Sequence, residues 1–282
     1  MELAAENTLK RPYAVIQPRK GLFQLDLASV WRHREMLYFL VWRDVIVRYK
    51  QTAIGASWVI IQPTLTMIIF TLIFGTMAKI PSDGIPYPVF AFSALLPWSY
   101  FAQALSRSSG SVVNSSSLVT KIYFPRLLIP LAASIAPVVD LFFSFIVLLA
   151  LMAWFRIVPT WGLLALPLFL VLAIMTALAV GLWASALNVK YRDVGSIIPF
   201  LVQVWMYASP VAYPVSMVPE KWRLIYSLNP MVAVIEGFRW AFLGKESPDL
   251  LMMAVSTGVV VLLLFGGIVY FKRMEQTFAD DI

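Results

Sequence analysis

Long apolar stretches separated by short polar segments dominate the pattern of hydrophobic and polar positions along this 282-residue chain. Crossing a bilayer takes about 20 mostly apolar residues in a helix, and six stretches reach that length. They lie near residues 53–78, 86–106, 127–155, 161–187, 196–215 and 250–271. The pattern therefore predicts an all-α integral membrane protein whose six transmembrane helices occupy residues 53–272.

Two of these predicted helices carry residues that are unusual in a membrane span. The fifth contains Pro199 and Pro210, and neighbouring helices must satisfy the carbonyls that proline leaves free. The third contains Asp140, an acid that is costly to bury in lipid. We expect Asp140 to face a cavity or to pair with a nearby polar group; a role in proton transport is the alternative.

The segment before the first span, residues 24–52, mixes apolar and charged positions. Four of its apolar residues share one helical face, away from the arginines: Leu37, Leu40, Val41 and Val45. Such a pattern predicts an amphipathic helix that lies in the cytoplasmic interface of the membrane. Residues 1–23 are typical of a loosely ordered cytoplasmic tail, and we assign residues 273–282 to a cytoplasmic C-terminus.

Residues 217–243 fit neither a span nor a simple loop. Their apolar pieces are too short to cross, and four residues interrupt or bound them: Asn229, Pro230, Glu236 and Arg239. This pattern predicts re-entrant helices that dip into the outer leaflet and return before the last span. Asn229-Pro230 is a helix start signal and Gly244 is a stop signal.

The composition agrees with a membrane protein, because 60% of the residues are hydrophobic and 13% are charged, against about 25% charged in soluble domains. The net charge is +7. If both termini are cytoplasmic, that side holds sixteen of the 22 lysines and arginines, as the positive-inside rule favours. Topology therefore explains the basic surplus, and nucleic acid is not indicated as a partner.

Catalytic motifs are missing from the sequence. The chain has no cysteine, a single histidine (His33) and no phosphate-binding G-x-x-x-x-G-K-[ST] loop, so thiol chemistry, a histidine-rich metal site and direct ATP binding by that loop are excluded. The scattered carboxylates offer no nucleophile–base pair. We expect no catalytic residues, no metal site and no cofactor in this chain.

Aromatic residues make up 14% of the chain. A subset falls well inside the predicted spans or beside prolines: Phe70, Phe74, Trp98, Tyr100, Phe101, Trp205, Tyr207 and Tyr213. Aromatic faces stack on the apolar faces of sugar rings, so this set is consistent with a conduit along which a glycan slides. For each residue singly, packing between helices is the plainer explanation.

The two predicted cytoplasmic turns combine aromatic residues with charges. The first turn ends in Lys121, Ile122, Tyr123, Phe124, Pro125 and Arg126, and the second contains Lys190, Tyr191, Arg192 and Asp193. Anchoring by positive charge accounts for the lysines and arginines. It does not account for the aromatics, which are unfavourable in water unless something covers them.

Four motifs resemble those of the type-2 ATP-binding-cassette (ABC-2) exporter permeases. They occur in the family's order at residues 48–63 (RYKQTAIGASWVIIQP), 121–130 (KIYFPRLLIP), 209–214 (SPVAYP) and 228–244 (LNPMVAVIEGFRWAFLG). The similarity runs from about residue 25 to 272. It is strongest to the polysaccharide branch, which comprises the O-antigen (Wzm-like), teichoic-acid and capsule exporters.

This resemblance implies a transport subunit that works as a homodimer with two copies of a separate ABC ATPase subunit, which would bind ATP and Mg. Residues 119–126 would form the coupling helix in a groove of that ATPase, with the turn at 190–193 beside it. The substrate would be a glycan on a polyprenyl-pyrophosphate lipid, moved to the outer face of a bacterial inner (cytoplasmic) membrane, as in lipopolysaccharide biosynthesis.

Three cations beside the first span, Arg43, Arg48 and Lys50, are candidates to hold the lipid pyrophosphate at the cytoplasmic entrance, and simple anchoring explains them equally well. Within the family, export of teichoic acid, capsule or a small hydrophobic drug or lipid stays open. From other classes, an ion-driven secondary transporter or channel would depend on intramembrane charges such as Asp140, and a membrane-embedded enzyme lacks its catalytic constellation.

Overall fold

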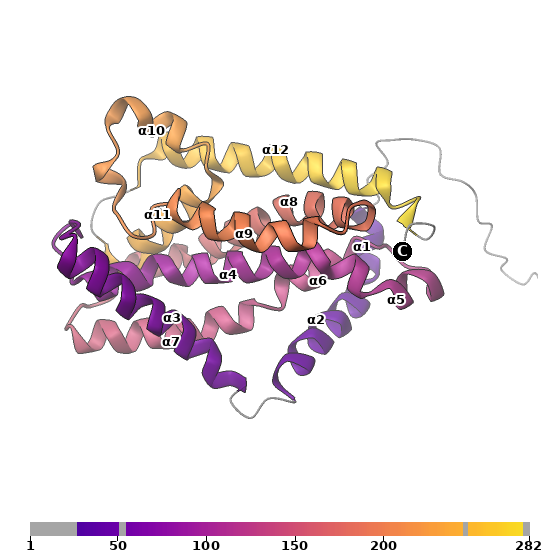
Figure 1. Cartoon of the computed structure of the whole chain (residues 1–282), viewed down its shortest axis with the longest axis horizontal. Helices are drawn as coiled ribbons and strands as arrows, with labels where there is room; N and C mark the ends of the chain where they lie inside the picture. Colours follow the sequence, from indigo (N-terminus) through magenta and orange to yellow (C-terminus); the bar gives the residue numbers. More distant parts are fainter. Residues whose placement is uncertain (1–26, 51–54, 245–247, 279–282) are drawn as a thin grey trace, which may run out of the picture.

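The computed structural model describes residues 27–50, 55–244 and 248–278, and the regular elements in these ranges are all helical (Figure 1). The helices are α1 (Leu27–Arg32), α2 (Arg34–Tyr49), α3 (Gly55–Phe70), α4 (Tyr87–Asn114), α5 (Ser116–Lys121), α6 (Leu128–Ile135), α7 (Val138–Trp154), α8 (Leu166–Lys190), α9 (Val194–Tyr207), α10 (Glu220–Tyr226), α11 (Pro230–Leu243) and α12 (Leu250–Met274). A π-helical segment, Thr71–Met77, continues α3, and 3₁₀ turns cover Trp161–Ala165 and Val215–Met217.

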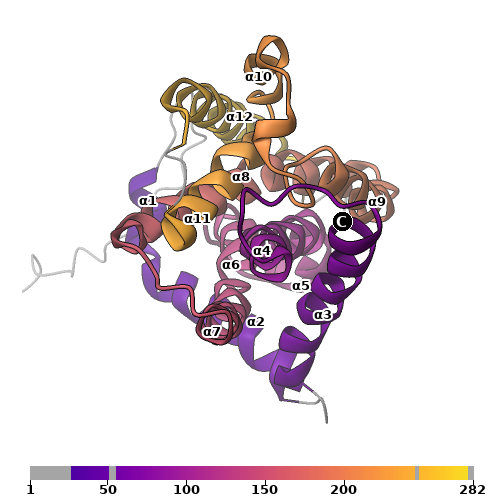
Figure 2. The same cartoon turned by 90° about the vertical axis from the view of Figure 1, so that its left-hand side faces the viewer.

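Helix α4 lies at the centre of the bundle. Viewed end-on, it is surrounded by α3, α7, α8, α9 and α11 (Figure 2). Every residue from Val89 to Phe101 except Ser99 is buried. A helix can be buried on all its faces only if other parts of the protein surround it. The core of the protein is therefore built on α4.

Four helical segments among the described residues are long and apolar enough to cross a membrane: Ser57–Met77, Leu128–Trp154, Trp161–Lys190 and Leu250–Met274. They match four of the six predicted spans. The predicted span 86–106 corresponds to α4, which has 28 residues but a serine-rich last third. The predicted span 196–215 corresponds to α9, whose 14 residues cover about 21 Å, less than a hydrocarbon core of about 30 Å.

The third predicted span is two helices, α6 and α7, rather than one. The break falls at Ala136 and Pro137, because the proline nitrogen has no hydrogen to donate and its ring clashes with the preceding turn. Asp140 consequently lies in the first turn of α7. This break places a carboxylate at a helix start inside the bundle.

Candidate functional site

The first predicted cytoplasmic turn is helical only in its first part. Helix α5 ends at Lys121, and Ile122 is extended with φ −127° and ψ 133°. The predicted coupling helix 119–126 is therefore wrong in its bounds. Pro125 contributes to the early end, because its nitrogen has no hydrogen to donate to the carbonyl of Lys121, four residues earlier, and its ring would clash with that carbonyl.

Phe124 does not project from this turn as expected. Only 6% of it is exposed, and it belongs to an apolar cluster with Leu40, Val119 and Phe271, which come from α2, α5 and α12. Aromatic burial of this kind stabilises the fold. The prediction that Phe124 fills a groove of a partner is corrected, since the protein itself covers this side chain.

Arg126 is also engaged within the chain. Its backbone N–H donates to Glu275 Oε1 at 3.0 Å, and its guanidinium donates to the backbone carbonyl of Glu275. Glu275 directly follows α12 and also pairs with Lys272 at 2.9 Å. Arg126 thus links the turn to the end of the last helix. The expectation that Arg126 contacts the ATPase as part of residues 119–126 is corrected, because its hydrogen-bonding groups are engaged within the chain.

The exposed part of the turn is Lys121, Ile122 and Tyr123, with Pro125 half-buried. Tyr123 is 93% exposed, so almost nothing in the described part of the chain touches it. An exposed tyrosine beside an exposed isoleucine is a small apolar patch of the kind that partners cover. Sequence reasoning found this patch but could not separate Tyr123 from Phe124.

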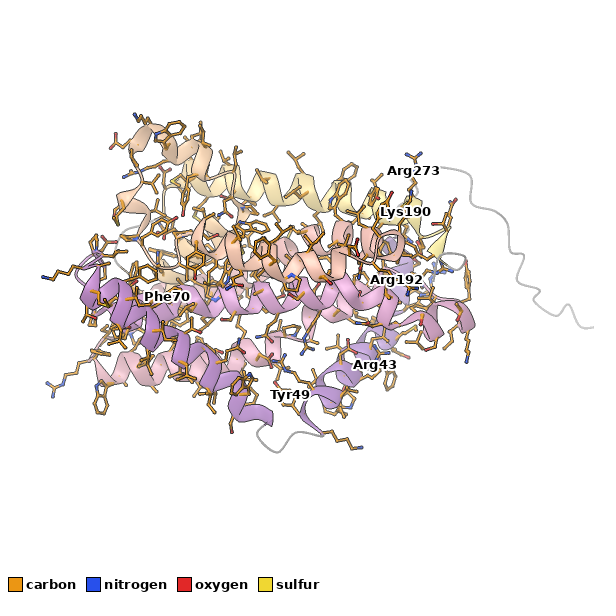
Figure 3. All side chains as sticks on the ribbon, viewed as in Figure 1. Arg43, Tyr49, Phe70, Lys190, Arg192 and Arg273 are labelled. Carbon is orange, nitrogen blue, oxygen red and sulfur yellow. The ribbon has the colours of Figure 1, made fainter. Side chains whose placement is uncertain are left out.

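The second turn, at the end of α8, is exposed throughout: Lys190, Tyr191, Arg192 and Asp193. The Lys190 ammonium lies 5.5 Å from the centre of the Tyr191 ring. Asn188 fixes the turn, because its amide donates to the Ser109 carbonyl of α4 and accepts from Gly195 N–H, both at 3.0 Å. Lys190, Arg192 and Arg273 gather at the end of the bundle that carries α5 (Figures 1 and 3).

Helix α2 has two apolar faces. Leu40 is buried, and Leu37 and Val41 pack against the same cluster, so the predicted face rests on the protein, next to α6. The other face exposes Tyr38, Phe39 and Trp42. Aromatic side chains of this type settle at membrane–water interfaces. The aromatic face was not predicted, although the sequence shows that Phe39 and Trp42 follow Tyr38 by one and four residues, a spacing that places them on one side of a helix.

The end of α2 reaches the break between α6 and α7. Arg48 forms an ion pair with Asp140, and the Tyr49 hydroxyl donates a hydrogen bond to the other carboxylate oxygen. The expectation that Asp140 pairs with a polar group is confirmed. Burial, reinforced by Asp140, raises the pKa of Tyr49 to about 12, so Tyr49 stays a neutral donor at physiological pH.

Two of the three predicted entrance cations therefore have partners within the chain. Arg48 pairs with Asp140, and Arg43 pairs with its neighbour Asp44 at 2.8 Å. Both Arg43 and Tyr49 lie on helix α2 (Figure 3). Lys50 is exposed at the C-terminal end of this helix, and no ion pair holds it in the described ranges.

The predicted conduit aromatics divide into three groups. Four of them are at most 5% exposed and pack the core of the chain, so the prediction that they line a conduit is corrected: Phe70, Trp98, Tyr100 and Phe101. Tyr100 donates to the Ser134 carbonyl at 2.9 Å. Three others are partly buried against the core: Phe74, Trp205 and Tyr213. Tyr207 alone among the eight is mostly exposed, at 55%.

Helix α11 begins and ends where the sequence signals indicated. The Asn229 side chain accepts from Met231 N–H, Pro230 is the first helical residue, and Gly244 adopts a left-handed φ of 62° after Leu243. Asn229 also accepts from the Trp205 indole at 3.0 Å. Helices α10 and α11 lie at the end of the bundle opposite α5 (Figure 1).

Arg239 is buried within this region, with 6% of its surface exposed. It pairs with Glu236 at 3.0 Å and donates to the carbonyls of Val211 and Tyr213 at 3.0 and 3.3 Å. Its guanidinium also lies 3.8 Å from the centre of the Phe90 ring. Arg239 therefore joins α11, the turn after α9 and α4, and its role is structural.

Apolar helices long enough to cross a bilayer, packed around a central helix and flanked by a helix with an exposed aromatic face, define a helical integral membrane protein. The model of the family described as ABC-2 type transporter matches residues 35–243. The chain belongs to this family, and as a permease it is a transport subunit integral to the inner membrane.

Several curated proteins are similar over most of the chain. The O-antigen export system permease protein RfbA of Myxococcus xanthus is 28% identical over 90% of this chain and 98% of its own length. The polysialic acid transport protein KpsM of Escherichia coli is 24% identical over 83% and 91%. The inner membrane transport permease YadH of Escherichia coli K12 is 23% identical over 86% and 91%.

Proposed function

We propose that this chain is the membrane-spanning subunit of an ATP-driven exporter that moves a lipid-linked polysaccharide, of the O-antigen kind, from the cytoplasmic to the outer face of the inner membrane. The observation that carries the proposal is the near full-length similarity to permeases named for O-antigen and polysialic acid export. The glycan is joined to a polyprenyl-pyrophosphate lipid, and both termini of the permease are cytoplasmic.

The proposal includes a homodimer of this chain and two copies of an ABC ATPase, which binds ATP and Mg. The two exposed turns at the α5 end support an ATPase docking surface there, formed by Lys121, Ile122, Tyr123, Tyr191 and Arg192. Exposed aromatics beside cations are the composition that protein interfaces favour. ATP binding closes the ATPase pair, and the turns carry that motion into α5 and α8.

Deletion of the gene tests the proposed substrate. We expect a lipid-linked polysaccharide to accumulate on the cytoplasmic face, with surface polysaccharide restored by the wild-type gene. Radiolabelled lipid extracts and surface staining measure the two quantities. An unchanged lipid-linked glycan pool, together with altered resistance to hydrophobic drugs, would instead assign the chain to small-molecule or lipid export.

Combined replacement of Ile122→Ala and Tyr123→Ala tests the docking surface. Interface aromatics each contribute about 1–2 kcal/mol or more, so we expect ATPase binding to weaken at least about tenfold and export to fall with it. Stability should stay within about 0.5 kcal/mol of wild type because both side chains are exposed. Affinity measured by pull-down or interferometry with the purified ATPase checks the result.

Phe124→Ala is the matched control from the same turn. Because Phe124 is buried, its truncation should cost about 3 kcal/mol of stability, seen as a lower unfolding midpoint in detergent. Wild-type affinity of the Ile122/Tyr123 variant for the ATPase would refute the docking surface, whatever the substrate of the exporter is.

A further inference from the structure

Helices α8 and α12 pack side by side, and an aromatic contact sets their relative level. The Trp183 indole stacks on Tyr270 with ring centres 4.8 Å apart, and its N–H donates to the Leu263 carbonyl at 3.0 Å. The same indole lies flat against Gly266 and Gly267, where added Cβ atoms would lie only 3.0 and 3.1 Å from it. Trp183 on α8 is therefore level with Gly266 and Gly267 on α12.

This register brings two cations to a similar level. Lys190 follows Trp183 by seven residues, which is two turns, so it lies on the same face of α8 about 10 Å further along. Arg273 follows Gly266 by seven residues in the same way on α12. Both residues lie at the α5 end of the bundle (Figure 3). Both are exposed, and neither forms an ion pair with a described residue.

The side of α12 that leads to Arg273 is apolar and uncovered. Leu262 precedes Arg273 by eleven residues, which is three turns, so the two lie on one stripe about 16 Å apart. Leu262 is 73% exposed, and Phe265 is exposed beside this stripe. Because α12 is long and apolar enough to cross a membrane, such a stripe contacts lipid chains. A cation at the end of the stripe suits a chain that carries a charged head.

Tyr270 adds a donor where the apolar stripe meets the cations. Its ring is held by Trp183, and its hydroxyl has no hydrogen bond to a described residue. Tyrosines of this kind sit at the membrane–water interface, with the ring among lipid chains and the hydroxyl at headgroup level. Tyr270 precedes Arg273 by three residues and so lies on the same side of α12.

Phosphate is the headgroup chemistry that these donors fit. The guanidinium of Arg273 offers a planar fork to two oxygens, and the ammonium of Lys190 adds a compact charge. The neighbouring acid on α12 does not neutralise them, because Glu275 is engaged by Lys272 and Arg126. Two cations favour a lipid with net negative charge, since a zwitterionic headgroup brings an ammonium of its own.

We infer that Lys190, Tyr270 and Arg273 bind the phosphate of an anionic phospholipid of the phosphatidylglycerol type, whose acyl chain lies along Leu262 and Phe265. This lipid is a bound component of the bilayer and not the cargo. The inference takes from the proposed function only that the α5 end is cytoplasmic. It assigns Lys190, predicted for ATPase coupling, to the lipid.

The test titrates the full chain in detergent with phosphatidylglycerol or with phosphatidylcholine of the same acyl chains, and native mass spectrometry measures each affinity. Each cation near an anionic lipid surface contributes about fivefold. The double variant Lys190→Gln/Arg273→Gln should therefore lose at least about tenfold in affinity for phosphatidylglycerol and keep its affinity for phosphatidylcholine. Tyr270→Phe, which keeps the ring and loses the hydroxyl, should lose about threefold.

A matched control removes two exposed cations from the opposite end. Arg156→Gln/Lys221→Gln changes the net charge equally and should keep phosphatidylglycerol affinity within about twofold of wild type. Unchanged affinity in the Lys190→Gln/Arg273→Gln variant, or an equal loss in the control, overturns the inference. If the double variant does not fold, unchanged affinity in both single variants overturns it.

Two further measurements exclude other ligands for the same cations. Inorganic phosphate at millimolar concentration should not displace phosphatidylglycerol; full displacement would make a free anion the ligand and overturn the lipid. The purified ATPase should bind the Lys190→Gln/Arg273→Gln variant within about twofold of wild type. A tenfold loss there, with lipid affinity kept, would give these cations to the docking surface. An unchanged glycan pool in the deletion strain rejects the proposed cargo and leaves the lipid site standing.

Discussion

Asp140→Asn lowers the free energy of unfolding by about 3 kcal/mol, because it leaves the Arg48 guanidinium without its carboxylate. Removing one partner of a buried ion pair lowers the free energy of unfolding by about 3–5 kcal/mol. The lower end applies here, since 25% of the Arg48 side chain is exposed while Asp140 is 4% exposed. Tyr49 also loses a charged acceptor. Denaturation of the purified protein in mixed detergent micelles measures the change.

The exposed pair on the same helix is the control. Arg43→Gln breaks a pair whose side chains are 43% and 23% exposed, and surface pairs of this kind contribute about 0–1 kcal/mol. Arg48→Gln combined with Asp140→Asn should recover part of the loss, because no unpaired charge remains. If Asp140→Asn were as mild as Arg43→Gln, the pair between α2 and α7 would not stabilise the fold.

The second large effect is expected for Arg239→Met, at about 3 kcal/mol. Methionine has a similar length but no donors, so the carbonyls of Val211 and Tyr213 lose their hydrogen bonds. Unsatisfied buried acceptors cost about 1–3 kcal/mol each, and the cation over the Phe90 ring is lost as well. The unfolding midpoint in detergent reports the change.

Arg192→Met provides the comparison from the opposite end of the bundle. Arg192 is exposed, and its replacement should alter stability by no more than about 0.5 kcal/mol. An Arg239→Met protein as stable as the Arg192→Met protein would mean that Arg239 is not needed to hold α11 against α4.

Features with a local cause were predictable from the sequence. The bounds of α11 follow from Asn229, Pro230 and Gly244, because capping and left-handed backbone depend on neighbouring residues. The long apolar runs gave four spans in the same way. The apolar runs at 86–106 and 196–215 gave the same signal, but they correspond to α4, which other helices surround, and to α9, which has only 14 residues.

Features that depend on distant contacts were not predictable. Tyr49 meets Asp140 across 91 positions, and Arg126 meets Glu275 across 149. No periodicity records such pairs, so the sequence could not show that Arg126 bonds to the end of the last helix. The burial of Phe124 and Tyr100 likewise depends on which helices pack together, and hydrophobicity alone does not distinguish a core aromatic from one that contacts a partner.

Helix α12 is continuous and runs between the two ends of the molecule (Figure 1). Its 25 residues extend about 37 Å at 1.5 Å per residue and include no proline. At one end Glu275 holds Arg126 of the first turn. Near the other, the Ser256 hydroxyl donates to the Ser227 carbonyl at 2.6 Å, just before α11. The turn at Arg126 and the segment before α11 are therefore connected by one continuous helix, whereas the bend at Pro137 separates α6 from α7.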